Sequence, residues 1–538
     1  MKHRCRVLGA TATASLLLVT AAACADPPSE RGRSGAETVV AFSSEVDTLD
    51  PHQFRSVAAY GVVGNIYASL LQEDYAAPAG GVLEYTGKST PYLARSATWN
   101  AARTTLTLKL REDAEFADGS PVTADDVVYS LRRALSDVGY ASAIGAWLNI
   151  PDAKKGVVAV DRSTVELRVT HYSPLIEQFL TFQIFPVLDE STATAAATKD
   201  DPWSAGFFAK DATESGPYAV SSQVKGQSMT LKKNGTYTAT DLTQAPDRIV
   251  VQNMPDPHQG FLALQNGAVD LAVGLTPDLA KAVEKDPRLR LYELPYSDIV
   301  YLGFNNQDPA LKDPRVRRAI SHLVPYDALR DDVMNGYAGP AYGMVPHPMT
   351  DALDEKGEKV AYPTDAAAAR KLLDEAGIRD GELSLTLSVP AAEVTLRQSA
   401  VFIQSALKKG GINVKVNEMS DAEFNSNLGR MQMFVDSWYS WGQDSVYQLY
   451  FLLKTGLFTN YTKFSNREVD RLIEKAKATP DPGERRELSR RAQQIVIDEA
   501  PAAFLFTRDV LIGARKGVSG ITHSNDANLR FDRLRVAP

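Results

Sequence analysis

The chain has 538 residues, more than one compact core usually holds, so more than one lobe is expected. Hydrophobic residues make up 44% of it and charged residues 23%, proportions that exclude a disordered or fibrous polymer. The formal net charge is −8 and basic residues form no long run, so nucleic acid is not expected as a partner.

The N-terminus has the pattern of an export signal. Basic side chains precede an apolar stretch over residues 7–20, which is shorter than the roughly 20 residues needed to span a bilayer. Ala21, Ala22 and Ala23 then lead into Cys24, and the residues after it are mostly polar. The pattern predicts a signal peptide over residues 1–23.

Cys24 stands where the lipidated cysteine of a bacterial lipobox would stand, although Ala21 occupies the place where Leu is usual. The other cysteine, Cys5, lies inside the signal, so the exported chain has no cysteine pair for a disulfide or a cysteine metal site. We expect a lipid anchor on Cys24, a flexible tether over 24–36 and a place on the outer face of the cell membrane. Ordinary signal cleavage beside a free Cys24 is the alternative.

Strand and helix patterns are mixed along the rest of the chain. Residues 38–42 and 105–110 have strand patterns, and Thr123 caps a helix with acidic residues in its first turn. Further helices are predicted near 315–323, 365–376, 394–409 and 469–478, and further strands at 383–387 and 412–416. The mixture predicts α/β lobes with mixed sheets.

Short motifs are spread from about residue 38 to residue 506. The most specific combines residues 108–111, Leu-Lys-Leu-Arg, with residues 116–127, which contain Phe-Ala-Asp-Gly and Thr-Ala-Asp-Asp-Val. Weaker motifs lie at 47–51, 64–71, 215–218, 264–270, 305–306, 315–320, 369–377, 411–414 and 470–473. Their order and coverage resemble the peptide- and nickel-binding extracellular components of ABC importers. Most of these residues are expected to form turns, caps and structural ion pairs.

The resemblance implies a large, three-subdomain clamp of the periplasmic-binding-protein type, with two lobes and mixed sheets. One lobe would comprise 37–275 and 506–538, with 58–210 as an inserted subdomain, and the other 276–505. Two hinge crossings are expected near 276 and 505. Ligand would bind between the lobes and stabilise the closed form, which an ABC permease and its ATPase then recognise.

In the dipeptide and oligopeptide receptors of this family, a carboxylate in a Trp-x-x-Asp-x-x-Asp-Pro stretch binds the ligand's α-amino group. The matching stretch here covers residues 434–445. If Trp438 takes the place of the family's Trp, Trp441 falls at the anchor position and Asp444 at the second Asp. If Trp441 takes that place instead, Asp444 is the anchor. The preceding strand favours the first register, in which the usual amine anchor is absent.

Three more residues are candidates for ligand contact. Arg397 matches the position of a carboxylate-binding Arg in dipeptide receptors, although a solvated residue at a helix start is the alternative. Tyr301 and Asn305 follow a predicted crossing, where a contact with the cleft is expected. Trp438 and Trp441 belong to an aromatic cluster that would stack on a ligand or pack in the core.

The function predicted from these observations is a monomeric, non-catalytic binding lipoprotein that takes up di- or oligopeptides for an ABC importer. The alternatives are a non-peptide ligand, such as an oligosaccharide, an opine-like compound or a metal chelate, and an orphan sensory lipoprotein. No cofactor and no directly bound metal are expected, because the seven histidines lack metal-ligand spacing.

Overall fold

The computed structural model describes residues 37–77, 80–139, 141–347, 349–353, 361–524 and 528–537. Its main element is a mixed 11-stranded sheet with the order β15-β14-β16-β12-β17-β11-β1-β10-β9-β8, and β13 pairs with β17. The bounds of these strands are β1 Glu37–Phe42, β8 Tyr218–Val224, β9 Ser228–Lys233, β10 Arg248–Asn253, β11 Leu271–Val273, β12 Leu289–Phe304, β13 Ala338–Gly339, β14 Leu383–Pro390, β15 Ile412–Met419, β16 Met433–Tyr439 and β17 Ala502–Arg515.

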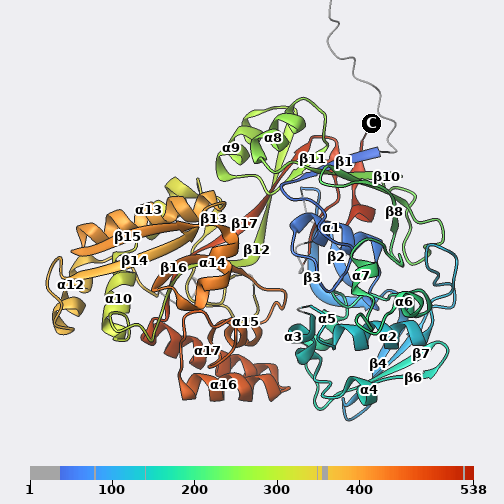
Figure 1. Ribbon diagram of the computed structural model, residues 1–538, viewed down its shortest axis with the longest axis horizontal. Coiled ribbons are helices and arrows are strands. Elements are labelled where there is room, and N and C mark those ends of the chain that lie inside the picture. Colours follow the sequence, from blue (N-terminus) through green and yellow to red (C-terminus); the bar gives the residue numbers. More distant parts are fainter. Residues whose placement is uncertain are drawn as a thin grey trace, which may run out of the picture. The chain divides into compact units, whose positions relative to one another are not determined.

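Two long antiparallel strands, β12 and β17, connect the two halves of this sheet (Figure 1). Residues 289–295 of β12 pair with 509–515 of β17, next to β11. Residues 299–303 pair with 502–507, next to β16, and the register shifts between Pro295 and Ile299. We call the described residues up to 294 and from 509 onward the first lobe, and residues 299–506 the second lobe.

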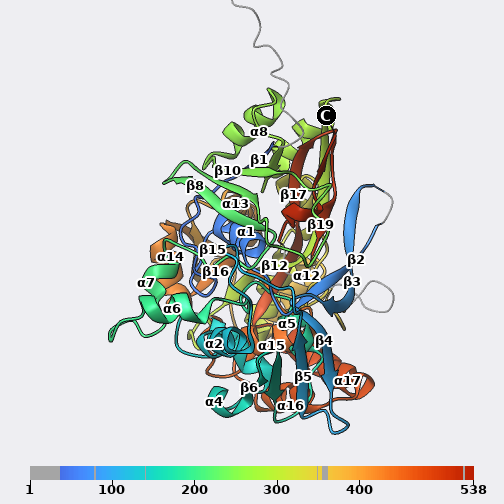
Figure 2. The ribbon, with the colours of Figure 1, turned by 90° about the vertical axis from the view of Figure 1, so that its right-hand side faces the viewer.

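The first lobe carries three smaller sheets, with the orders β19-β3-β2, β4-β5-β7-β6 and β18-β20, the last formed by β18 Val518–Ser519 and β20 Arg535–Val536. Helix α2 lies beside the four-stranded sheet in both views (Figures 1 and 2). The strands are β2 Leu71–Ala76, β3 Val82–Pro91, β4 Ala94–Trp99, β5 Thr105–Leu110, β6 Val157–Asp161, β7 Thr164–Arg168 and β19 Ile521–His523. The helices used below are α1 Val57–Ile66, α2 Ala124–Ala134, α5 Leu175–Phe179, α8 Pro257–Gln265, α9 Pro277–Lys285 and the 3-10 turn η1 Ala146–Leu148.

The second lobe surrounds β14, β15 and β16 with helices. Its main helices are α10 Pro314–Leu323, α12 Ala366–Glu375, α13 Val394–Lys409, α14 Asp421–Asn427, α15 Ser445–Leu453, α16 Arg467–Ala478 and α17 Pro482–Glu499. The four helices predicted for this region are confirmed within two residues at each end, and the two predicted strands begin where expected but each extends three residues further.

The C-terminal tail packs on the first lobe. Strand β19 pairs in parallel with β3, and the Asn65 amide of α1 donates to the Leu529 carbonyl at 2.9 Å. Just before β12, the other strand that joins the two halves of the sheet, helices α8 and α9 pack together in a core cluster of the first lobe. The predicted crossings near 276 and 505 stay predictions, whereas the strand pairing changes partners at 295–299 and 507–509.

The motif at residues 47–51 forms part of the scaffold. The Asp50 carboxylate accepts two hydrogen bonds from the Arg133 guanidinium of α2, at 2.9 and 2.7 Å, and neither side chain is exposed. Arg133 Nε also donates to the Trp203 carbonyl at 2.8 Å. Because a buried ion pair needs such complete bonding, these residues fasten the loop to α2. Burial, followed by the charge of Arg133, lowers the pKa of the neighbouring His52 to about 3.

Candidate ligand-binding site

The loop between β16 and α15 contains the predicted anchor residues. Asp444 is the N-cap of α15, and its Oδ1 accepts the backbone N–H of Val446 at 2.9 Å and of Tyr447 at 3.0 Å. The same carboxylate forms a bidentate ion pair with Arg485 of α17, whose Nη2 lies 2.6 Å from Oδ1. Both side chains are buried. Asp444 is thus neutralised inside the second lobe, and the ligand role predicted for it stays a prediction.

Two tryptophans of the same stretch have aromatic neighbours on different elements. The Trp441 indole stacks on the Tyr60 ring of α1, with centroids 6.4 Å apart and planes inclined by 6°. Trp438, at the end of β16, is half-buried and stacks on Phe451 at 6.3 Å. Its buried Nε1–H has no hydrogen-bond partner among the described residues. Trp441 therefore contacts the first lobe directly, whereas Trp438 packs on its own lobe.

Strand β16 is fully paired on one side and only partly paired on the other. Residues 433–439 pair with 298–304 of β12. On the opposite side only Met433 and Phe434 pair, with Leu387 and Ser388 of β14. In the part of the chain that the structure describes, residues 435–438 therefore have no strand partner on that side. Backbone groups at an edge of this kind are available to an extended ligand.

An arginine and several carboxylates meet where β12, β16 and β17 run side by side. Arg508 Nε donates to Asp298 Oδ2 at 2.7 Å, and its Nη2 donates to Ser437 Oγ at 2.7 Å. Its Nη1 lies 3.6 Å from Oε2 of Glu393, the N-cap of α13. Asp298 Oδ1 is buried and has no hydrogen-bond partner within the described ranges. We call these residues, together with Asp436, the crossing cluster.

Asp436 gives this cluster an excess of negative charge. Burial raises the pKa of the Asp436 carboxyl to about 7; the Ser437 backbone N–H and the Arg508 charge oppose this rise, and the charges of Asp298 and Glu393 add to it. Asp298 and Glu393 lie against the single guanidinium of Arg508, whereas Asp436, next to Ser437 in β16, points to the other face of the strand and acts on the cluster through its charge. Carboxylates outnumber the guanidinium, so a positively charged group from outside the chain would be favoured here. Desolvation of the surrounding groups makes such an attraction stronger than it would be in water.

Tyr301 and Asn305 differ in their distance from the crossing cluster. Tyr301 is 1% exposed, packs on Phe434 at 5.8 Å and lies opposite Asp436 in the strand pairing. Burial and the Asp436 charge raise the pKa of the Tyr301 hydroxyl well above its usual range. Asn305 follows the end of β12 and accepts the Gln307 N–H at 3.0 Å. It lies seven residues beyond Asp298, about 23 Å along an extended strand. Ligand contact by either residue stays a prediction.

Arg397 lies in the first turn of α13, one turn after Glu393. Its Nη1 is 3.7 Å from Glu418 Oε2, and its buried Nε has no partner in the described part of the chain. The Arg397 side chain is 37% exposed, so its guanidinium retains donors for a carboxylate. This position suits the predicted role, which stays a prediction.

Sequence reasoning misses the four charged members of the cluster, Asp298, Glu393, Asp436 and Arg508. Asp298, Asp436 and Arg508 are ionisable residues inside strands made mostly of apolar residues, which is a rare environment for such residues. That pattern could have identified them as candidates. Their proximity could not be predicted, because it depends on the pairing of three strands that are far apart in the sequence.

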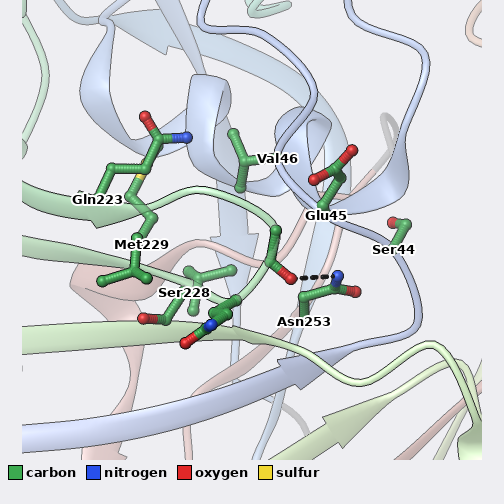
Figure 3. A pocket seen from close by; sticks show the side chains of 11 residues that line it. Ser44, Glu45, Val46, Gln223, Ser228, Met229 and Asn253 are labelled. Carbon is green, nitrogen blue, oxygen red and sulfur yellow. Dashed lines mark hydrogen bonds between the residues drawn. The ribbon is translucent and has the colours of Figure 1, made fainter.

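Two hollows lie away from the crossing cluster. Figure 3 shows one at the β8–β9 hairpin, where Asn253 Nδ2 donates to the Gly226 carbonyl at 2.9 Å. The other lies in the first lobe and is lined among others by Glu73, Gln183 and Arg530. Neither hollow contains a residue that the sequence predicts for the ligand site.

Several expectations concern metals and the membrane. Within the described residues, no three or more His, Cys, Asp or Glu side chains are grouped to hold a metal ion. In that same part of the chain, no helix combines the length and the apolar character needed to cross a bilayer. Cys24, the signal peptide and the tether lie outside the described residues, so lipidation stays a prediction.

The chain is similar to known proteins over most of its length. The probable D,D-dipeptide-binding periplasmic protein DdpA of Escherichia coli K12 is 27% identical over 434 residues, which cover 79% of this chain and 81% of that protein. The glutathione-binding protein GsiB of the same organism is 26% identical over 508 residues, covering 92% and 94%. The ABC transporter-associated periplasmic binding protein DppA from Helicobacter pylori, solved with the peptide STSA, has a TM-score of 0.80 at 22% identity, covering 93% and 98%.

A family match gives the broader assignment. Residues 88–460 match the bacterial extracellular solute-binding proteins, family 5, middle part, which is more than half of the chain. The predicted family and the predicted two-lobe α/β clamp with mixed sheets are confirmed. Proteins of this family bind solutes, peptides among them, and work with ABC permeases. The chain belongs to family 5 of the bacterial extracellular solute-binding proteins.

Proposed function

We propose that this protein captures a peptide or a peptide-like solute between its two lobes and delivers it to an ABC importer. The observation that carries the proposal is the open edge of β16 over residues 435–438. A peptide lying along this edge would pair its backbone with β16, while Trp438 and Trp441 would contact its side chains. The names of two relatives, which refer to D,D-dipeptides and glutathione, support a peptide-like ligand.

We propose further that the crossing cluster holds the ligand's amino group. Asp444 already neutralises Arg485, which supports the register that puts Trp441 at the anchor position. Asp436 and Asp298 then supply the negative charge that this position lacks. A buried ammonium beside Asp298 would form charge-assisted hydrogen bonds, including one with Asp298 Oδ1, which has no partner among the described residues, and the charge of Asp436 would add to the attraction. A non-peptide cation would satisfy the same groups, so a cationic non-peptide solute is the second candidate.

The hinge lies at residues 295–299 and 507–509 in this proposal. At these positions β12 and β17 change from one set of neighbouring strands to the other, and the register shifts. A few residues that absorb a change of backbone angles are sufficient for domain closure. Asp298 and Arg508 belong to these segments, so ligand bound to them would act directly on the closure equilibrium.

The experiment is thermal-shift screening and native mass spectrometry of protein freed of bound ligand by unfolding and refolding. Free di- to pentapeptides, their N-acetylated forms and oligosaccharides serve as probes. We expect stabilisation by free peptides, lost on acetylation and in Asp436→Asn, but kept in the control Asp374→Asn, which changes an exposed carboxylate.

The alternatives give different results. Equal stabilisation by free and acetylated peptides would keep the peptide proposal and contradict the amine site. A response to oligosaccharides alone would contradict both.

We also propose that the mature protein is a monomer anchored outside the cell by a lipid on Cys24. The basis is the signal pattern and the cysteine that follows it. Intact mass spectrometry of the membrane-extracted protein should show the lipid, and Cys24→Ser should release the protein. Cys5→Ser is the matched control, because Cys5 lies in the predicted signal. Retention of Cys24→Ser at the membrane would contradict the proposal.

A further inference from the structure

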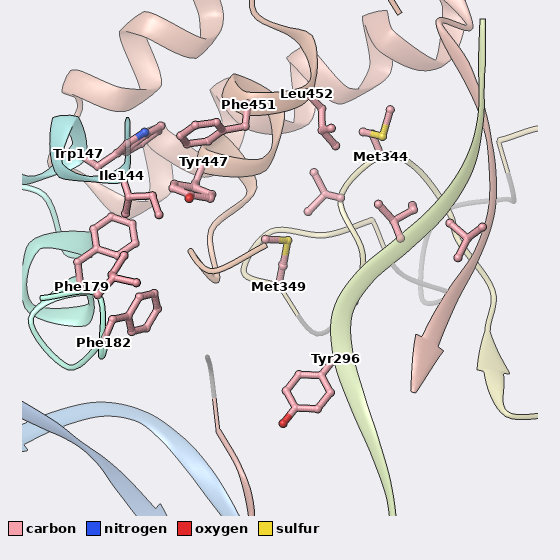
Figure 4. Packing of buried hydrophobic residues seen from close by; sticks show 14 of the residues in the cluster. Ile144, Trp147, Phe179, Phe182, Tyr296, Met344, Met349, Tyr447, Phe451 and Leu452 are labelled. Carbon is pink, nitrogen blue, oxygen red and sulfur yellow. The ribbon is translucent and has the colours of Figure 1, made fainter. Parts of the chain in front are cut away.

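Aromatic side chains from the two lobes pack directly on one another at a second place, away from the crossing cluster (Figure 4). Trp147 of η1 contacts Tyr447 and Tyr450 of α15, with ring centroids 5.2 and 5.3 Å apart. It also contacts Phe451 at 6.4 Å, and Phe179 of α5 contacts Tyr447 at 5.7 Å. Trp147 and Phe179 belong to the first lobe, and the three α15 residues to the second.

A cation covers this set from the second lobe. Lys477 of α16 places its Nζ over the Trp147 ring at 4.7 Å and over the Tyr450 ring at 5.1 Å. Burial lowers the pKa of the Lys477 ammonium. An ammonium over two aromatic faces is attracted by both ring quadrupoles, and partial desolvation strengthens that attraction.

The contact is as well buried as a core. Trp147 is 1% exposed and Phe179 is fully buried, and one continuous hydrophobic cluster contains residues of both lobes. If the lobes separated, these rings would be exposed to water. Each aromatic pair favours the closed arrangement by roughly two- to tenfold beyond its area burial.

Both sides of the contact are fixed to their own lobes. On the second lobe, α15 is held by the Asp444–Arg485 ion pair and by the Ser489 hydroxyl, which donates to Ser445 Oγ at 2.6 Å. On the first lobe, Phe179 packs on Phe182 at 5.5 Å, and the Leu71 N–H donates to the Leu180 carbonyl at 3.1 Å. Separation of the rings therefore requires movement of the lobes and not of a loop alone.

We propose that Trp147, Phe179, Tyr447, Tyr450, Phe451 and Lys477 form an aromatic latch that closes the lobes without ligand. The latch uses side chains only, and its ring and cation contacts all lie between residues of this chain, although the buried Nε1–H of Trp147 has no hydrogen-bond partner among the described residues. Its free energy therefore adds to the closure equilibrium whether or not a solute is bound. The closed form is then already populated in the ligand-free protein, and the solute shifts this population further. This inference does not rest on the identity of the solute.

The proposal is tested by pulsed electron–electron double resonance, which measures the distance between spin labels on the two lobes in protein freed of its ligand. The only cysteines, Cys5 and Cys24, are replaced by Ser. Spin labels are then attached through Val160→Cys in the first lobe and Val401→Cys in the second, both exposed positions. We expect a closed-distance population without ligand, which falls at least about tenfold relative to the open one in Trp147→Ala.

Two further variants keep the test independent of any folding defect in Trp147→Ala. Lys477→Ala changes a half-buried residue of α16, and we expect it to lower the closed population about two- to fivefold. Trp203→Ala is the matched control, because Trp203 packs on Tyr129 at 5.6 Å within the first lobe. Its distance distribution should equal that of the parent protein. A parent protein that is wholly open without ligand would overturn the proposal, as would equal distributions in the parent and Lys477→Ala.

Discussion

The crossing cluster and the aromatic latch both lie at the boundary of the lobes, but their chemistry is opposite. The crossing cluster has three carboxylates for one guanidinium, and it includes a buried Asp298 oxygen without a hydrogen-bond partner in the described residues. The latch consists of rings that cover one another, with a single cation above them. The first has carboxylates in excess of its guanidinium, whereas the rings of the second are already covered by one another and carry no excess of negative charge.

Because of this difference, the two places stabilise the closed form in different ways. Contacts that are complete within the chain stabilise the closed form under all conditions. Groups that lack a partner favour closure only when a solute supplies that partner. A binding protein built in this way needs less of its ligand's binding free energy to close the lobes, and its specificity is concentrated at the crossing cluster.

The largest expected effect is on the free energy of unfolding, and it should follow substitution of Asp444 but not of Asp436. Asp444→Ala leaves the buried Arg485 without its partner and removes the α15 cap, so we expect a loss of about 3–5 kcal/mol in the free energy of unfolding. Urea denaturation measures it. Asp436→Asn breaks no ion pair and should not show this loss. A fully stable Asp444→Ala protein that no longer binds peptides would make Asp444 the ligand anchor. It would contradict the structural role of Asp444 and the placement of the ligand's amino group at the crossing cluster.

The next effect, spread over several pH units, is expected from the titration of Asp436. Because its pKa is raised to about 7 in the folded protein, the folded state holds a proton that the unfolded state releases near pH 4. This group therefore makes the free energy of unfolding fall between about pH 4 and pH 7, by at most about 1.4 kcal/mol per pH unit. Asp436→Asn should remove that slope.

Stability curves of the parent protein and Asp436→Asn, measured without ligand from pH 4 to pH 8, check this expectation. The difference between the two proteins isolates Asp436 from the other titrating groups. Parallel curves would mean that Asp436 titrates near its ordinary pKa and that its carboxyl is not desolvated in the folded protein.

A still smaller effect concerns the stack between Trp441 and Tyr60. A double-mutant cycle of Trp441→Ala and Tyr60→Ala should give a coupling of about 1 kcal/mol in the free energy of unfolding. Trp203 and Tyr129 form a reference pair inside one lobe. Both pairs should show coupling in the free energy of unfolding. Only substitutions in the Trp441–Tyr60 pair should change the distance between the lobes. Absence of coupling between Trp441 and Tyr60 would show that this loop does not hold the lobes together.

The sequence is sufficient for the family, the fold class and most elements, because these depend on local patterns. Thr123 caps α2 as predicted, and its N–H donates to Asp126 at 2.7 Å. The helix predicted over 394–409 has those bounds in the structure. Periodicity and capping are properties of neighbouring residues, so they are visible without tertiary information.

The site is less predictable because it depends on residues that are distant in sequence. The tryptophans of the 434–445 stretch could be identified from a motif, but Arg508 and Asp298 could not. Asp444 has the residue type expected of an amine anchor, yet its environment contains Arg485, which sequence alone does not place nearby. Whether a buried carboxylate binds a ligand or an internal arginine depends on packing, and no local pattern reports it.

The smallest expected effect concerns Asn305, which the resemblance places near the cleft. Its side chain closes a turn onto the Gln307 N–H, about 23 Å along the strand from Asp298. Asn305→Ala should cost less than about 1 kcal/mol of stability and should change ligand affinity less than about twofold. Arg397→Ala is the informative comparison, because Arg397 lies one turn from Glu393 and keeps donors for a carboxylate. If Asn305→Ala weakened binding more than Arg397→Ala, the solute would extend along β12 far beyond the crossing cluster, and the cluster could not be the centre of the site.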